Sequence, residues 1–244
     1  MGHIDLLLEP YYNSNTGSDI FMSCIKNARI AFFLASINLT DKLELANSLR
    51  KSLTVLDGDP LIMPIPDDAP TEIPRIILRS KSEKYALNVT PQRIDFFYSN
   101  KEQDGSHYED FTKEILRTIK TIENIVMQKF SVRINRLGLM VDMSLKKDDA
   151  IKYILNYFNK SFILKDNPLE AQIHMFNRET VGGFNVNNWI RIIAQKHDEK
   201  RTNVLISNDI NTLIEKGKSH TSEEVNKFYS SMLKFVIENL KDYV

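Results

Sequence analysis

Residues 74–98, PRIILRSKSEKYALNVTPQRIDFFY, decide the fold class because they contain three consecutive strand-like runs. The runs at 75–79, 85–89 and 93–98 are rich in β-branched and aromatic residues, and the breaks between them are short enough for hairpins. A helix is predicted next, because apolar residues recur on one stripe: Phe111, Ile115, Ile119, Ile122 and Val126. Such a meander has one apolar face that the helix would cover, so the segment predicts an α+β fold.

Upstream of this segment the sequence predicts one more strand and one more helix. β-Branched and apolar residues accumulate over 29–40, and Thr40 or Asp41 can cap a helix that carries leucines at three- and four-residue spacing. The stretch 57–73 holds four prolines and predicts an irregular connector. Residues 1–27 contain a turn-rich polar stretch and are interpreted as a loosely anchored N-terminal lead.

The second half of the chain repeats this order of elements without visible residue identity. Strands are expected at 131–145, 171–181, 184–195 and 203–207, with a helix from about 147 and a last helix capped by Ser222. Gly182-Gly183 marks a hairpin. We therefore expect two similar lobes, 28–130 and 131–244, each built as strand–helix–three-stranded antiparallel meander–helix. The alternatives are one continuous domain with one sheet, or a coincidence between two common meanders.

Composition limits the classes of function. Lys plus Arg and Asp plus Glu both number 32, so the zero net charge disfavours nonspecific nucleic-acid wrapping and polybasic membrane binding. The single cysteine, Cys24, is compatible with a reducing compartment. The chain has no apolar stretch of membrane-spanning length, and its start lacks the pattern of a signal peptide. A cytoplasmic location is the expectation.

The sequence offers no recognisable catalytic, metal or cofactor motif. The five histidines show no short ligand spacing, and none of the eight glycines lies in a Walker or dinucleotide-binding pattern. A nucleophile elbow of the Gly-x-Ser-x-Gly type is also missing. We therefore predict no catalytic residues, no metal and no cofactor.

Five residues are nevertheless candidates for ligand binding: His174, Arg178, Trp189, Arg191 and Asp142. Trp189 with Phe184 and Arg191 could form a stacking platform for a base or sugar, although a half-buried sheet tryptophan is the simpler interpretation. His174, Asp142 and Arg191 could face a cleft between the lobes. A nucleic-acid surface would use Arg178, Trp189 and Arg191 together with Lys196, Lys200 and Arg201.

Several stretches resemble a sporadically distributed, uncharacterised family of bacterial and archaeal proteins of similar length. The resemblance lies in Val132–Leu139, in the paired runs 74–80 and 85–89, in the helix 108–122, and in 207–211 followed by the helix 222–240. The chain departs from the family pattern at Met140-Val141-Asp142 and at Asn211. The resemblance implies the fold and a cytoplasmic location, and no activity.

Three functional hypotheses follow. The leading one is a non-enzymatic binding or assembly module whose edge strands pair with a partner protein or a second copy. The alternatives are an enzyme of unfamiliar type with a cleft between the lobes and, in third place, a nucleic-acid-binding protein.

Overall fold

The computed structural model describes residues 23–35, 41–66, 68–101, 108–147, 149–158, 170–195 and 203–241. The elements follow one another as β1 (Ser23–Leu34), α1 (Lys42–Ser52), β2 (Leu61–Ile62), β3 (Ile76–Arg79), β4 (Tyr85–Val89), β5 (Arg93–Ser99), α2 (Tyr108–Glu123), the π-helical turn η1 (Asn124–Lys129), β6 (Ile134–Lys146), α3 (Ala150–Phe158), β7 (Glu170–Val181), β8 (Phe184–Gln195), β9 (Asn203–Thr212) and α4 (Ser222–Lys241). The expected α+β class is confirmed.

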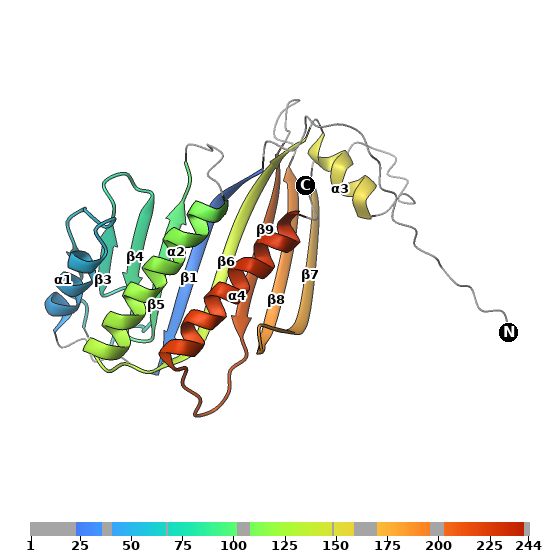
Figure 1. Ribbon diagram of the computed structural model, residues 1–244. Coiled ribbons are helices and arrows are strands. Elements are labelled where there is room, and N and C mark those ends of the chain that lie inside the picture. Colours follow the sequence, from blue (N-terminus) through green and yellow to red (C-terminus); the bar gives the residue numbers. More distant parts are fainter. Residues whose placement is uncertain are drawn as a thin grey trace.

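All described strands belong to one nine-stranded sheet with the order β2-β3-β4-β5-β1-β6-β9-β8-β7. Every neighbouring pair is antiparallel, and the meander β3-β4-β5 is the one expected from residues 74–98. β1 and β6 lie side by side in the middle, so the strands of both halves of the chain share one sheet (Figure 1).

The helices cover one face of this sheet. α2 and α4 pack against each other across its middle, α1 contacts β2 and β3, and α3 contacts β7 and β8 (Figure 1). Phe32 of β1 and Tyr229 of α4 are fully buried, with ring centroids 5.4 Å apart. The Tyr229 hydroxyl donates a hydrogen bond of 2.9 Å to the Ala31 carbonyl, which fastens α4 to the central strand. The core therefore lies between the sheet and the helix layer.

Two strands extend beyond their expected bounds by several residues. β1 was expected within 29–40 but begins at Ser23, so it takes in the last residues of the expected lead 1–27; residues 36–40 lie outside the described part of the chain. A bulge between Ile25 and Asn27 hides the alternation that would have signalled the early start. β9 continues past the expected 203–207 to Thr212. The sequence did not predict this extension because polar residues, such as Asn208, occupy positions on its buried face. The Asn208 side chain is hydrogen-bonded there.

The helix start and turn signals are largely confirmed. Asp41 caps α1 by accepting a 2.7 Å hydrogen bond from the Glu44 amide. Gly182-Gly183 forms a two-residue hairpin in which both φ angles are positive and Val181 pairs with Phe184. The expected cap of α4, Ser222, was wrong by one position. Thr221 caps this helix through a reciprocal pair of hydrogen bonds with Glu224, and Ser222 instead donates to Glu123.

The proline-rich connector 57–73 is mostly irregular, as expected, but it contains the short edge strand β2. Arg75, at the start of the meander, is 1% exposed and donates to the carbonyl oxygens of Pro66, Ala69 and Ile73 at 3.1–3.3 Å. One guanidinium group therefore holds the connector against the sheet.

Within the described ranges, no helix combines the length and apolarity that crossing a bilayer requires.

Candidate functional site

The face of the sheet opposite the helices, called the open face here, carries polar and aromatic side chains. Along β1, buried Ile30, Phe32 and Leu34 alternate with Arg29 and Phe33 on the open face. The described part of the chain places no helix over this face (Figure 1). Because alternate residues of a strand face opposite sides, the strand register identifies the residues of the open face.

An arginine cluster occupies the middle of the open face; we use this name for Arg29, Phe33, Arg93, Asp95 and Arg136. The Asp95 side chain is only 4% exposed and accepts one hydrogen bond from Arg29 Nε at 2.9 Å and another from Arg93 Nε at 2.7 Å. One carboxylate therefore fixes two guanidinium groups that come from neighbouring strands.

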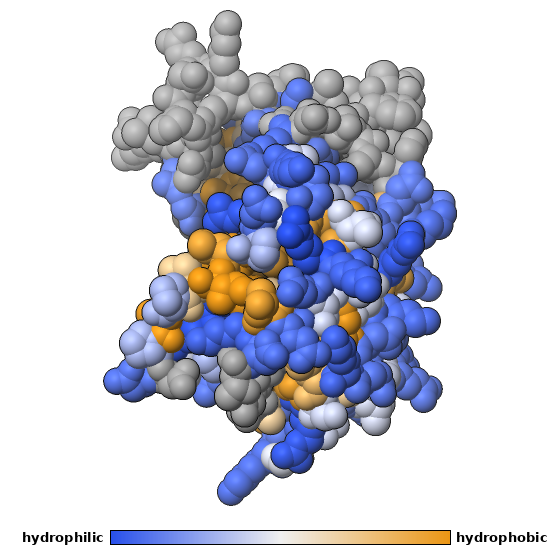
Figure 2. Space-filling model, turned by 90° about the vertical axis from the view of Figure 1, so that its left-hand side faces the viewer, coloured by the Kyte–Doolittle hydropathy of each residue, from blue (hydrophilic) through white to orange (hydrophobic). Residues whose placement is uncertain are grey.

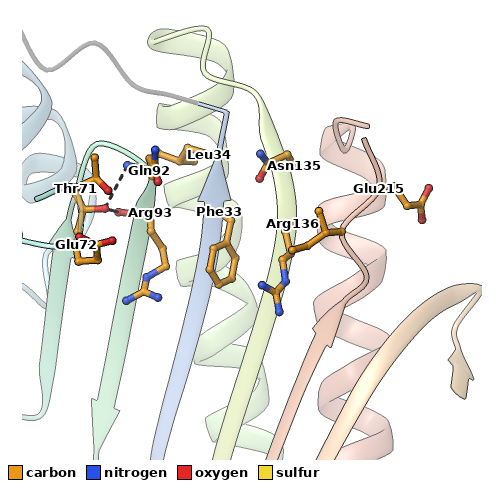
Figure 3. Close-up of a pocket in the computed structure, with 11 residues that line it drawn as sticks. Phe33, Leu34, Thr71, Glu72, Gln92, Arg93, Asn135, Arg136 and Glu215 are labelled. Atoms are coloured by element: carbon orange, nitrogen blue, oxygen red, sulfur yellow. Dashed lines mark hydrogen bonds between the residues drawn. The ribbon is translucent and has the colours of Figure 1, made fainter. Parts of the chain in front are cut away.

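Phe33 lies between Arg93 and Arg136 in one row across β5, β1 and β6. The guanidinium carbons lie 5.5 Å and 4.8 Å from the centre of its ring, within the range of cation–π attraction. Figure 3 shows both arginine side chains beside Phe33 and directed the same way along the sheet. The aromatic ring thus orients two cations at once.

Arg136 is also held by residues of β9. Its Nη2 donates to Asn211 Oδ1 at 2.5 Å, and its Nε donates to the Thr212 carbonyl at 3.2 Å. Partial burial lowers the pKa of Arg136, and the nearby carboxylate of Asp209 opposes this shift. A guanidinium keeps its proton despite such a shift, because its ordinary pKa is far above neutrality. Arg136 is therefore a preorganised cation that is partly removed from water.

Two pockets share Phe33, Arg93 and Arg136 as a common wall. The larger has a volume of about 340 Å³ and lies at the strand ends, where the connector supplies Thr71 and Glu72. The segment after β9 lines its other side with Ile214 and Glu215. Figure 3 shows Glu215 on that side. The smaller, about 190 Å³, lies further along the sheet. It is lined by Arg29, Ala31, Phe33, Arg93, Arg136, Gly138, Leu139, Met140, Asp209 and Asn211.

The five candidate residues named from the sequence all lie on this same face. Three of them lie in one row across β7, β8, β9 and β6. In the strand register His174 pairs with Arg191, and Ser207 of β9 pairs with both Arg191 and Asp142. Asp142 accepts a 3.3 Å hydrogen bond from Asn27 Nδ2. His174 Nε2 lies 3.3 Å from Gln172 Oε1. Neither residue lines the two pockets described above.

Trp189 is 43% exposed and packs on Phe176 of β7, which is 41% exposed. Their ring centroids lie 4.4 Å apart, and the guanidinium carbon of Arg178 lies 6.0 Å from the Phe176 ring. One expected member of the platform, Phe184, instead packs on Phe228 of α4. Lys196, Lys200 and Arg201 lie outside the described residues.

Sequence reasoning missed the arginine cluster. Its members come from β1, β5 and β6, which are far apart in the chain and adjacent only in the folded sheet. A signal was present in the alternation Arg29–Ala31–Phe33 against Ile30–Phe32–Leu34, because arginine on the exposed side of a central strand has to be accommodated. This alternation alone does not identify the partner strands that bring Arg93 and Arg136 next to Phe33.

His220 is a buried polar residue that lies away from the open face. His220 is 4% exposed, and neither ring nitrogen has a hydrogen-bond partner among the described residues. Burial lowers the pKa of His220, and the carboxylate of Glu224, whose Oε2 lies 3.8 Å from Nδ1, opposes this shift.

Within the described ranges, no group of three or more histidine, cysteine, aspartate and glutamate side chains is placed to hold a metal ion.

The chain was also compared with known proteins. No family model matches it, and no curated protein matches it significantly.

Proposed function

We propose that this protein is a non-enzymatic, cytoplasmic binding module that holds an anionic ligand on the arginine cluster. The observation that carries the proposal is the arrangement of three arginines around Phe33 and the nearly buried Asp95, at the wall shared by two pockets. Arginine presents a planar fork of donors that matches the oxygens of carboxylates and phosphates. Holding these forks in place before the ligand arrives reduces the entropy lost on binding.

The distribution of charge supports an anionic ligand. The basic residues at open-face positions are Arg29, Arg79, Arg93, Arg136, Lys146, Arg178 and Arg191. The acidic residues at such positions are Asp95, Asp142, Glu170 and Asp209. The chain as a whole is neutral, so the open face has a surplus of positive charge that the remaining surface balances.

We also propose that the two halves arose by internal duplication. In each half a strand and a helix are followed by a meander and a long helix, and the first strands of the two halves meet in the middle of the sheet. The arginine cluster lies across this meeting point, since Arg136 belongs to β6 and the other members to β1 and β5. A site at the junction of two repeats is a common location for a ligand.

Replacing Arg136 by alanine is expected to remove most of the anion binding. Phosphate, pyrophosphate, citrate and nucleoside monophosphates should raise the melting temperature of the wild-type protein in a dose-dependent way. Loss of one charge-assisted contact of about 2 kcal/mol corresponds to a roughly thirtyfold weaker affinity. Titration calorimetry with the best anion of this panel measures that loss.

Arg117→Ala is the matched control, because Arg117 is an exposed arginine on α2, on the helix-covered side. It should bind the same anion as tightly as the wild type. Equal affinity in the Arg136→Ala variant, or no response of the wild-type protein to any anion, would contradict the proposal.

A second candidate function is assembly with another protein at the β2 edge of the sheet. β2 pairs with β3 alone, and exposed apolar side chains lie near it: Leu61 is 52% and Ile73 39% exposed, and Leu43 of the neighbouring helix α1 is 58% exposed. Figure 2 shows apolar surface gathered on this side of the molecule. An edge strand beside apolar surface suits pairing with a partner chain or a second copy.

The mass of the native protein tests this second candidate. We expect the native mass to show a dimer or a retained partner protein. Leu61→Lys should abolish this association. Phe176→Lys should leave it unchanged, because Phe176 lies at the opposite end of the sheet. A monomer without a partner would remove the motive for it.

A further inference from the structure

We propose that the ligand of the open face is a single-stranded nucleic acid. Its phosphates would contact Arg29, Arg93 and Arg136, and its bases would reach the Phe176–Trp189 pair. This inference rests on the binding function proposed above and specifies its ligand class.

A continuous path joins the arginine cluster to the aromatic pair. The smaller pocket ends at Asp209, which pairs with Trp189 in the strand register, and Trp189 pairs with Phe176. From Arg136 to Met140 this path follows β6 for about 13 Å, and from Asp209 to Phe176 it crosses two strand spacings, or about 10 Å. A path of this length suits several successive nucleotides of a flexible strand and exceeds the size of a single small anion.

The aromatic pair has the exposure that stacking requires. Phe176 and Trp189 each leave about two fifths of their surface accessible on an open sheet face, and Arg178 lies beside them. Bases of any sequence stack on such rings, and arginine adds a cationic partner for the phosphates. The pair also contributes to the sheet as a cross-strand contact, so stacking has to be tested separately from stability.

The path between the two ends is lined by amides. Asn187 and Asn211 lie next to each other on β8 and β9, with Asn187 Nδ2 donating to Asn211 Oδ1 at 3.3 Å. The Asn187 Oδ1 atom is buried and has no hydrogen-bond donor among the described residues. An unsatisfied acceptor is costly, and because the Asn187 residue as a whole is only partly buried, its side chain can turn this oxygen toward the ring and exocyclic N–H groups of a base.

The dimensions of the face favour a single strand over a duplex. The major groove of B-DNA is about 12 Å wide and admits a helix or a two-stranded ribbon. A sheet of nine strands, spaced by about 4.8 Å, is far too broad to enter it. A single strand needs no groove, because it can lie along the surface and turn its bases toward the protein.

The first measurement is fluorescence anisotropy of labelled 12-nucleotide thymidine and uridine oligomers over a range of salt concentrations. Three arginine–phosphate contacts predict that log K falls with log salt with a slope of about −2, since each contact to a single strand contributes about 0.7. Arg136→Ala should reduce the magnitude of this slope by about 0.7 and weaken binding on the order of tenfold. Arg117→Ala should change neither quantity.

The second measurement uses Trp189, the only tryptophan of the chain, as an intrinsic probe. Unlabelled oligomers should quench its fluorescence in the wild-type protein. Trp189→Ala should weaken oligomer binding on the order of tenfold, whereas Trp189→Phe should stay within about threefold of the wild type because it keeps a ring on which a base can stack. Circular dichroism of each variant confirms that it is folded at the temperature of the titration.

Three competitors separate failure of this inference from failure of the proposed function: heparin, a polyglutamate peptide and a blunt 12-base-pair duplex. Arg136-dependent binding of heparin or polyglutamate without oligomer binding overturns the nucleic-acid assignment and leaves the anion-binding function standing. Equally tight binding of the duplex overturns the single-strand assignment. Oligomer binding that is insensitive to both Arg136→Ala and Trp189→Ala overturns the assigned surface, and binding of no anion overturns both proposals.

Discussion

Replacing Asp95 by asparagine should lower the free energy of unfolding by about 2–3 kcal/mol. The Asp95 carboxylate is nearly buried and accepts from two arginines, and an asparagine of the same shape offers one acceptor atom and turns an NH₂ donor toward the second guanidinium. Breaking a fully buried pair costs about 3–5 kcal/mol. The expected loss is smaller because Arg29 and Arg93 are 32% and 36% exposed, so water compensates part of it.

Urea denaturation followed by circular dichroism measures this change. Asp209→Asn is the control, because Asp209 is another carboxylate of the open face but is only half-buried, and it should cost less than about 1 kcal/mol. Titration calorimetry of Asp95→Asn with the same anion measures the balance of two opposing effects on ligand binding. Removing a negative charge strengthens attraction of an anion, whereas releasing Arg29 and Arg93 loses their preorganisation. We expect the second effect to dominate, with weaker anion binding in Asp95→Asn; unchanged stability would contradict the role given to Asp95.

Replacing Arg75 by alanine should lower the free energy of unfolding by about 3 kcal/mol and loosen the connector that follows β2. The variant loses a large buried side chain and leaves the carbonyl oxygens of Pro66, Ala69 and Ile73 without their donors. Removing a buried cation recovers some desolvation energy, which keeps the total below the sum of these losses. The free energy of unfolding of Arg75→Lys should lie between those of the wild type and Arg75→Ala. The lysine ammonium group reaches fewer of the three carbonyl oxygens than the planar guanidinium fork does.

Limited proteolysis is the direct measure of the local effect. Arg75→Ala should be cut within the connector much faster than the wild type, while the rest of the chain stays protected. Thr71 and Glu72, which line the larger pocket, belong to this connector, so anion affinity should fall as well. A variant that resists the protease as well as the wild type does would show that the connector is held by other contacts.

The sequence was a good guide to the elements and a poor one to the site. The meander β3-β4-β5, the glycine hairpin and the Asp41 cap depend on neighbouring residues, so a pattern in one stretch was enough to predict them. The site depends on which strands become neighbours. Arg93 and Arg136 are 43 positions apart in the chain and meet only because β1 lies between their strands. Trp189 and Arg178, which the sequence named as candidates, lie on the open face beside Phe176, and their part in binding stays a prediction.

The pairing of β1 with β6 also affects how the chain folds. The middle of the sheet joins residues about 115 positions apart, as between Asn27 and Asp142, so a long loop has to close before the two central strands can meet. Contacts of such long range slow folding. During synthesis the first half emerges with one side of β1 unpaired until residue 146 has left the ribosome, and an unpaired strand edge invites pairing with other chains. We therefore expect the nascent protein to depend on chaperones until β6 docks. In the folded protein both sides of β1 are paired, so this exposed edge no longer exists.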